Sequence, residues 1–501
     1  MRPILLITIV SVFALAFAGC EGDAGPQGPP GPQGPQGPPA VDSEFSFAGK
    51  QGEPCQHCHL TIVEQWAVTG HSEATSGLDP EDQDNAYCMQ CHTTGWDRPI
   101  ESFGTVFETV PAGPDTAGYD DYFRVDSELA EERRMDLAGV QCEACHGGMG
   151  PDFNSHRPEV SFSTRFETVG SDTVSTSLCA PCHNNQLEEW AVSGHSFYNE
   201  ETGEMGDIEM FNQEHYIDRS FCNLCHTSEG FIRENDPAYA DYDFPEEKSF
   251  IGCVTCHDPH QGPNGSGNEA QLRAVGPVEV AYAPLTGPGE PSVPVMENRG
   301  TGQTCAQCHH ARRDTENVQG QIAEGYAHFG PHSSPQMDMF LGYGSYEIDG
   351  YTYTGRYDAD PTAHYNGTAN ACVDCHMAPA EGMNHTPHQF FINDPDNPEW
   401  LGCVGCHGTA ANSDQLYDGI RTDVETKLNE IAVLLGYADL AAFEAAIDDD
   451  NPTWTVQQRE AAYAAVFVLS DGSWGVHNPD YTIDLLDNAI DYLTPVKGAG
   501  K

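Results

Sequence analysis

The sequence predicts a mainly α-helical protein with much irregular coil and a helical bundle at its C-terminal end. Three observations lead to this fold class. Only 39% of the 501 residues are apolar, against 51 Gly and 35 Pro, which is a thin supply for an ordinary core. A C-x-x-C-H motif recurs along the chain, and apolar residues return at helical spacing after about residue 414. Something other than side chains is therefore expected to fill much of the interior.

Eighteen of the 19 cysteines belong to nine C-x-x-C-H motifs, far more than chance would give. This motif is the attachment signature of c-type haem, because two thiols one helical turn apart add to the vinyl groups and the following His binds the iron. Zinc ribbons would pair two C-x-x-C units, and disulfides would need no His. We therefore expect nine covalently attached haem c groups and no disulfide. The haem-binding thiols are Cys55, Cys58, Cys88, Cys91, Cys142, Cys145, Cys179, Cys182, Cys222, Cys225, Cys253, Cys256, Cys305, Cys308, Cys372, Cys375, Cys403 and Cys406. The proximal iron ligands are His59, His92, His146, His183, His226, His257, His309, His376 and His407.

The N-terminal segment is interpreted as an export signal. Arg2 and the apolar run 4–18 are typical of a secretory signal, and the run is shorter than the roughly 20 residues of a membrane helix. The F-A-G-C segment ending at Cys20 resembles a bacterial lipobox. Residues 1–19 are therefore expected to be a lipoprotein signal peptide and Cys20 the lipidated end of the mature chain. Glu21 favours onward export to an outer membrane.

A collagen-like segment follows the expected lipidation site. Glycine occupies every third position from Gly22 to Gly37, which is the collagen pattern. Six triplets are few for a stable triple helix, so residues 20–40 are expected to form a stiff, lipid-anchored Gly-X-Y stalk of polyproline-II conformation. Trimerisation through this stalk is the alternative.

The haem motifs form an internal repeat of three. Trp66 and His71 follow the first cysteine of their motif by eleven and sixteen residues, and Trp190 and His195 repeat both offsets. The third copy is more diverged, but the first cysteines of its last two motifs, Cys372 and Cys403, are 31 residues apart, as are Cys222 and Cys253 of the second and third motifs of the second copy. We expect three-haem modules and then a haem-free helical region that carries a distal His. The boundaries are 41–165, 166–300 and 301–412 for the modules, and 413–501 for the helical region.

The helical region shows three apolar stripes with the spacing of α-helices. The last helix is expected to begin at Asn478-Pro479, because Asn suits the N-cap and Pro the first helical position. The stripes are most simply core positions of a bundle packed on the last haems, and a subunit interface is the alternative. The residues are Val424, Leu428, Ile431 and Leu435, then Ala461, Ala465, Val468 and Leu469, then Ile483, Leu486, Ile490 and Leu493.

The segment from Cys55 to His156 carries the run C-x-x-C-H…W-x-x-[ST]-G-H…C-x-x-C-H-T-T-G…C-E-A-C-H-G-x-x-G…H. This run resembles the cytochrome c554/c′ family, which is related to the hydroxylamine oxidoreductase and pentahaem nitrite reductase group. The segment from Cys179 to His260 is the next best match, and residues 475–481 are similar to the start of that group's C-terminal His-bearing helix. The resemblance implies a multihaem cytochrome organised around a stacked haem chain.

Thirteen of the 22 histidines remain after the nine proximal ligands, which is enough to give every iron a second, distal His ligand. Candidates were chosen at repeated positions, beside haem motifs or at the head of the final helix. They are His71, His156, His195, His215, His260, His332, His364, His385 and His477. His310, His328 and His388 are left unassigned, and His57 lies inside the first motif, where its geometry is unsuitable. The sequence does not say which haem each distal His serves.

Iron with two axial His ligands has no open position for a substrate, so we expect outer-sphere electron transfer and assign no catalytic residue. The net charge of −56 excludes a nucleic-acid partner and disfavours anionic substrates. The leading hypothesis is an exported lipoprotein at the outer membrane or cell surface that carries electrons outward. Its partners would be other cytochromes or redox proteins, or extracellular minerals.

Two alternatives remain at this stage. A multihaem reductase of a nitrogen or sulfur oxyanion would need a five-coordinate haem, and the chain has no C-x-x-C-K motif of the pentahaem nitrite reductases. A homo-oligomer, in particular a conductive cytochrome filament, would be recognised by electron microscopy of cell-surface material.

Overall fold

A computed structural model provides the structure of the protein. It describes residues 47–96, 101–102, 105–106, 118–146, 166–169, 172–175, 178–196, 220–236, 239–240, 249, 251–260, 270–282, 293–325, 329–380, 383, 385–392, 400–447 and 453–494. The predicted signal peptide, Cys20 and the collagen-like stalk lie outside these residues.

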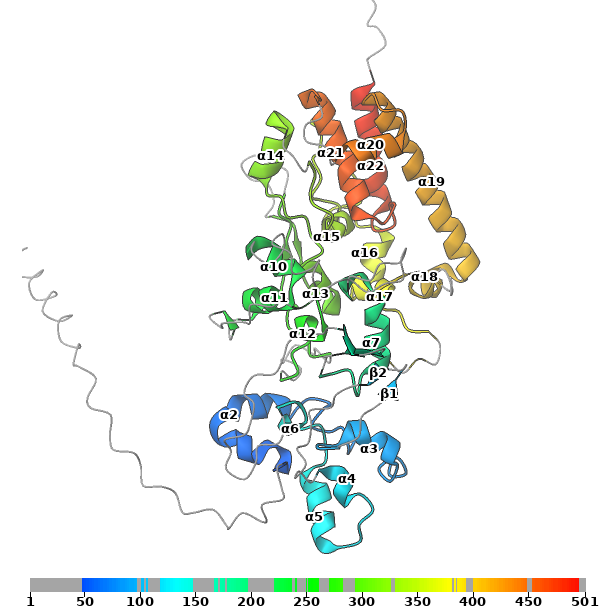
Figure 1. The fold of residues 1–501 in the computed structure, drawn as a ribbon. Helices are drawn as coiled ribbons and strands as arrows, with labels where there is room; N and C mark the ends of the chain where they lie inside the picture. The colour runs from blue at the N-terminus through cyan, green and yellow to red at the C-terminus, as the bar shows by residue number, and fades with distance from the viewer. Residues whose placement is uncertain are drawn as a thin grey trace, which may run out of the picture.

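The described part of the first predicted module consists of short helices joined by turns and coil. Its elements are η1 (Lys50–Gly52), α2 (Glu53–Trp66), α3 (Ala86–His92), β1 (Glu101–Ser102), β2 (Thr105–Val106), α4 (Tyr119–Tyr122), α5 (Glu128–Asp136) and α6 (Cys142–His146). The helices α2 to α6 form the lower end of the molecule in Figure 1, and β1 and β2 lie above them, below α7.

The middle of the chain has the same character, with short helices and two small hairpins. Its elements are β3 (Phe166–Val169), β4 (Asp172–Ser175), α7 (Asn184–Ala191), η2 (Gly194–Ser196), α10 (Ser220–His226), α11 (Ser228–Asn235), α12 (Cys253–Cys256), β5 (Val278–Glu279), β6 (Val295–Met296), η4 (Gly300–Gly302), α13 (Gln303–Ala306), α14 (Thr315–Glu324), α15 (Gln336–Leu341), α16 (Ala363–Gly367), α17 (Cys372–His376) and α18 (Leu401–His407).

The β-structure in the described residues is limited to antiparallel pairs. β1 pairs with β2, β3 with β4 and β5 with β6; in the longest pair Phe166 lies opposite Ser175. The haem motifs lie in or beside short helices, and the fourth motif forms a turn directly before α7. The predicted class, mainly helical with much irregular coil, is therefore confirmed.

Side-chain caps explain where several helices begin. Asn85 accepts a hydrogen bond from the Tyr87 backbone at the start of α3, and Ser127 caps α5 in the same manner. At the last helix, Asn478 accepts from the Tyr481 backbone and Pro479 occupies the first position. The predicted start of this helix is confirmed.

The chain ends in four helices, namely α19 (Ala410–Leu434), α20 (Leu440–Ile447), α21 (Val456–Asp471) and α22 (Pro479–Leu493). They stand together at the upper end of the molecule in Figure 1, with α21 and α22 beside the long α19. Among the described residues, no helix is both long and apolar enough to span a membrane.

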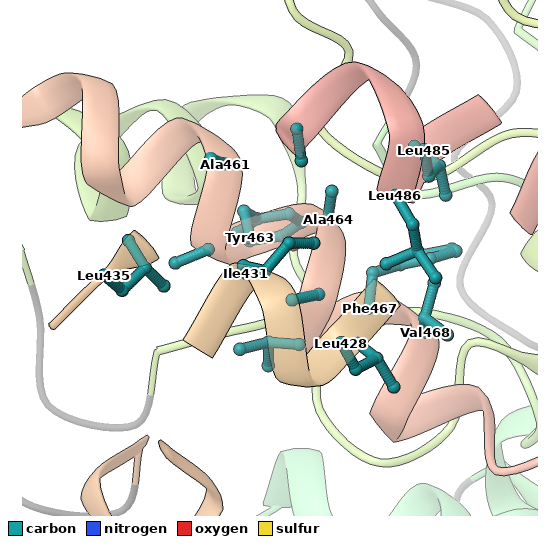
Figure 2. Packing of buried hydrophobic residues seen from close by; sticks show 14 of the residues in the cluster. Leu428, Ile431, Leu435, Ala461, Tyr463, Ala464, Phe467, Val468, Leu485 and Leu486 are labelled. Carbon is teal, nitrogen blue, oxygen red and sulfur yellow. The ribbon is translucent and has the colours of Figure 1, made fainter. Parts of the chain in front are cut away.

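The largest hydrophobic cluster of the described residues lies in this C-terminal region. Leu428 and Ile431 of α19, Phe467 of α21 and Leu486 of α22 are fully buried against one another (Figure 2). The cluster in the first module is small by comparison and centres on Met89. The bundle core also contains side chains of the preceding module, such as Val318, Ile322 and Met339, and a second buried cluster that includes Met296 and Leu341 lies in the middle of the chain.

We expect Phe467→Ala to lower the free energy of unfolding of the bundle by about 3–5 kcal/mol, because it leaves a cavity in a fully buried site. Urea unfolding followed by far-ultraviolet circular dichroism measures this. Val433→Ala on α19 is the control, since Val433 is 52% exposed and its loss is expected to change stability by less than about 0.5 kcal/mol. Equal effects of the two substitutions would contradict the assignment of this core.

Candidate haem sites

Seven of the nine motif histidines each face a second histidine. The distances between ring centres are 6.0 Å for His146–His260; 6.1 Å for His71–His183, His195–His309 and His364–His407; and 6.2 Å for His226–His332, His257–His388 and His376–His477. Two imidazoles on opposite sides of one metal, with nitrogens about 2 Å from it, have ring centres roughly 6 Å apart. The residues therefore fit bis-His ligation of a haem iron beside each of these seven motifs.

Hydrogen bonds at Nδ1 orient many of these rings. A backbone carbonyl can accept only from a protonated Nδ1, which leaves the lone pair of Nε2 for a metal. The bonds are His92 to Ala74 at 2.6 Å, His257 to Ala270 at 2.6 Å, His364 to Val476 at 2.7 Å, His376 to Phe390 at 2.9 Å and His388 to Thr386 at 2.7 Å. The backbone thus sets the tautomer that iron ligation requires.

Burial keeps several of these rings neutral. Desolvation is the main cause that lowers the pKa of His183, His195, His332 and His376 to about 4. A neutral imidazole is the form that binds a metal, so these rings need not lose a proton near neutral pH.

His477 behaves differently. Burial would lower its pKa, but the charge of Asp471 and a hydrogen bond to it raise the pKa above its ordinary value. Nδ1 of His477 lies 2.6 Å from Oδ1 of Asp471.

Five of the seven ring pairs connect different predicted modules. His71 follows the first motif and faces His183 of the fourth, and His195 follows the fourth motif and faces His309 of the seventh. The repeated W-x-x-[ST]-G-H histidine therefore always lies opposite the first motif of the next module. His260, which follows the sixth motif, faces back to His146 of the third. Successive modules are interleaved rather than placed end to end.

Cysteine side chains of different motifs are also in contact. Pairs of neighbouring thiols join the first motif to the third, the second to the fourth, the fifth to the seventh and the seventh to the eighth. These pairs are Cys55–Cys142, Cys91–Cys182, Cys225–Cys308 and Cys305–Cys372. Because the cysteines are the expected attachment points of haem, neighbouring attachment points lie side by side.

The repeated tryptophans fix the third motif of a module against the first. Nε1 of Trp66 donates to the carbonyl of Val140 at 3.0 Å, and Nε1 of Trp190 donates to that of Ile251 at 2.9 Å. Both carbonyls lie two residues before the first cysteine of a third motif. The sequence marked these tryptophans only as a repeat, and the structure gives them this role.

In the segment around residue 388, the histidine that faces a haem motif is not the one predicted from the sequence, which is His385. Nε2 of His385, the nitrogen that would bind iron, lies 2.8 Å from Oε1 of Glu189. The other oxygen of Glu189 accepts from the backbone N–H of His388 at 2.8 Å, and the His388 ring faces His257. The structure therefore places His388, not His385, opposite a motif histidine, because Glu189 holds His385 in an ion pair.

The remaining predicted ligands are placed as follows. His71, His195, His260, His332, His364 and His477 each face a motif histidine. His156 and His215 lie outside the described residues, and within those residues His59 and His92 have no second histidine ring opposite them. Their ligation therefore stays a prediction.

The eighth motif does not take the place in the third module that the sequence spacing suggested. A Cβ on Gly52 would lie 3.5 Å from Sγ of Cys142, and one on Gly302 would lie 3.0 Å from the backbone nitrogen of Cys372. The eighth motif therefore occupies the place of a third motif, rather than that of a second. His388 follows this motif and faces the sixth, as His260 follows the sixth and faces the third. Once the eighth motif is recognised as equivalent to the sixth, His388 takes the position of His260, and this is the signal that would have identified it as a distal ligand.

Comparisons with known proteins agree with this geometry. The family model for cytochrome c554 and c-prime matches residues 54–110 and 178–258, and the model for cytochrome c552 matches residues 362–497. Multiheme cytochrome MtrA of Shewanella baltica (strain OS185) is 23% identical over 224 residues, which are 40% of this chain and 64% of MtrA. The match thus spans less than two thirds of that relative.

Two solved structures are similar over most of the chain. Outer cell wall cytochrome OcwA is 16% identical with a TM-score of 0.51, over 90% of this chain and 100% of OcwA. An undecahaem cytochrome from the S-layer of Carboxydothermus ferrireducens is 18% identical with a TM-score of 0.46, over 91% of this chain and 70% of that one.

Facing histidine pairs beside C-x-x-C-H motifs, in a mainly helical chain with the fold of OcwA, define a multihaem c-type cytochrome. The resemblance to the cytochrome c554/c′ family is confirmed by the family model that matches the first two modules. The second model covers the C-terminal segment that contains His477.

We expect His388→Ala to convert one low-spin haem of the loaded protein to a high-spin haem, because its ring is the one opposite His257. His385→Ala is the matched control from the same segment and is expected to leave the spin state of every haem unchanged. Electron paramagnetic resonance of the oxidised protein distinguishes the two spin states. A high-spin signal in the His385 variant alone would reverse the assignment.

Proposed function

We propose that this cytochrome conducts electrons through nine covalently bound, mostly bis-His haems on the outside of the cell, and passes them to partner cytochromes, other redox proteins or extracellular minerals. The observation that carries the proposal is the set of seven facing histidine pairs. When bound, haem c supplies an iron that gains and loses one electron. With both axial positions taken by protein, exchange of electrons is favoured over binding of a substrate.

The chain's own residues support transfer over a distance. The thiol pairs Cys55–Cys142, Cys91–Cys182, Cys225–Cys308 and Cys305–Cys372 bring the attachment points of different motifs together. The histidine pairs interleave one module with the next, so no module stands apart from its neighbours. We infer a continuous path that follows the three-module organisation over residues 41–412 and ends against the haem-free region 413–501.

The turn between α21 and α22 positions the proposed distal ligands of the eighth and ninth haem sites. This turn contains His477, which faces His376, and the carbonyl of Val476, which accepts the hydrogen bond from His364. His364 in turn faces His407. The haem-free bundle therefore orients the distal ligands of both the eighth and the ninth motif.

The proposed location rests on the N-terminal sequence. The expected lipoprotein signal, the lipidated Cys20 and the collagen-like stalk would anchor the chain and hold the haem region away from a membrane. OcwA, whose fold this chain shares, is named an outer cell wall cytochrome, and this agrees with an external position. Release of the protein from intact cells by an added protease would test the location.

The haem number is tested by intact mass of the protein made with a c-type cytochrome maturation system. We expect nine covalent haems, and eight after the double substitution Cys403→Ala and Cys406→Ala, because each motif is expected to bind one haem. A mass of fewer than nine haems in the parent protein would contradict the count.

Electron transfer is tested by rapid mixing of the fully reduced protein with a ferric mineral or an oxidised partner cytochrome. We expect all haem absorbance to oxidise, since the path is continuous. A fraction that stays reduced would show a break in it, and rapid nitrite-dependent oxidation would favour a reductase instead.

A further inference from the structure

We propose that Asp471 is a positioning residue that sets the haem between His376 and His477 to a lower reduction potential than its neighbours. It would do so by accepting the Nδ1 hydrogen bond of the distal ligand. This inference deepens the proposed function and rests on the bis-His ligation proposed above.

The geometry places a buried carboxylate against Nδ1 of one of the two histidines that would hold the haem. Oδ1 of Asp471 lies 2.6 Å from Nδ1 of His477, and the Asp471 side chain has no exposed surface. The His477 ring lies opposite His376, with 6.2 Å between ring centres. A short hydrogen bond to a buried carboxylate draws the Nδ1 proton away from the ring and makes Nε2 a stronger electron donor.

The local chain holds this carboxylate in place. Asp471 is the last residue of α21, and Gly472 follows with a φ of 73°, a conformation that suits glycine. Oδ2 of Asp471 accepts from the backbone N–H of Ser473 at 3.3 Å and also from its hydroxyl. The same hydroxyl oxygen accepts from the backbone N–H of His477 at 3.2 Å. One tight turn therefore fixes both the carboxylate and the ring.

No Arg or Lys of the described residues forms an ion pair with Asp471, and its only ionic partner there is His477. The carboxylate charge is therefore directed at the ligand rather than neutralised by a cation. Because the Asp471 side chain is fully buried, water screens its charge little, and the charge would act strongly on an iron bound by His477.

The Nδ1 bonds described at other ring pairs go to uncharged partners. Those of His257, His364 and His388 go to backbone carbonyls, and those of His332 and His309 go to Ser334 and Gln336, both at 3.3 Å. Nδ1 of His260 is 3.8 Å from Asp258, which is beyond hydrogen-bond distance, and Asp258 pairs with Arg273.

A negative charge on a ligand favours the ferric over the ferrous state, so the site beside Asp471 is expected to be the harder one to reduce. Its cysteine Cys372 touches Cys305 of the seventh motif, and the same turn orients His364 of the ninth site. The eighth site thus lies between the seventh and the ninth. With a lower reduction potential, its haem would stay oxidised while electrons reside on the haems of those two sites.

The test is Asp471→Asn in the haem-loaded protein, followed by a spectroelectrochemical titration. We expect one of nine components to become easier to reduce by about tenfold in its equilibrium constant, which is 59 mV for one electron. The low-spin resonance signal of one haem is expected to change with it. Asp258→Asn and Ser334→Ala are matched controls beside other distal ligands, and neither is expected to shift a component by this amount.

Two further variants separate the possible failures. Asp471→Glu keeps the charge and is expected to leave the component nearer its original potential than Asn does, and it serves if the Asn variant does not fold. His477→Met replaces the ligand itself and is expected to alter the spectrum of one haem. If His477→Met changes no haem, the proposed ligation is wrong. If it changes one haem while Asp471→Asn and Asp471→Glu shift none, the ligation stands and the role of Asp471 is refuted.

Discussion

The separation of about 6 Å between facing imidazoles is the constraint on which the rest of this structure depends. The first module buries an apolar cluster of only five described residues, which is too few to determine its shape. Five of the seven pairs join one predicted module to the next and so fix their relative positions. Of the other two, His376–His477 joins the third module to the tail and His364–His407 lies within the third module. Short helices, turns and coil are sufficient between these fixed points, which explains why regular structure is sparse outside the C-terminal bundle.

Local patterns were enough to predict what depends on a few consecutive residues. The motif histidines follow directly from the C-x-x-C-H spacing, and the start of α22 follows from Asn478 and Pro479. Repetition carried the prediction further, because His71 and His195 share one offset and the structure gives them one role. The apolar stripes of the tail likewise became the buried surfaces of a bundle.

The distal partner of a given motif could not be predicted in the same way, since it is a property of the tertiary structure. His385 and His388 are three residues apart, and no local feature tells which one faces a haem motif. The decision comes from Glu189, a residue of a distant helix, which binds the ring of one and the backbone of the other. The place of the eighth motif escaped prediction for a similar reason: sequence spacing suggested a second motif, whereas its contacts with Gly302 and Cys305 are those of a third.

The interior and the surface of this protein have opposite electrostatic character. The chain carries a net charge of −56, yet most ring pairs lie in surroundings where burial disfavours a charged imidazole. Buried carboxylates are used sparingly and in specific contacts. Glu143, inside the third motif, accepts the backbone N–H groups of Ala48 and Gly49 at 3.0 and 2.7 Å and so holds the segment before the first motif.

The turn between α21 and α22 links the stability of the C-terminal bundle to the proposed eighth and ninth haem sites. Val476 and His477 can keep their partners only while the two helices stay packed. Partial melting of the bundle would therefore withdraw His477 from the proposed eighth site and remove the hydrogen bond that orients His364 at the ninth. Selection for a stable bundle and selection for intact ligation of the last two proposed haems would then act on the same residues.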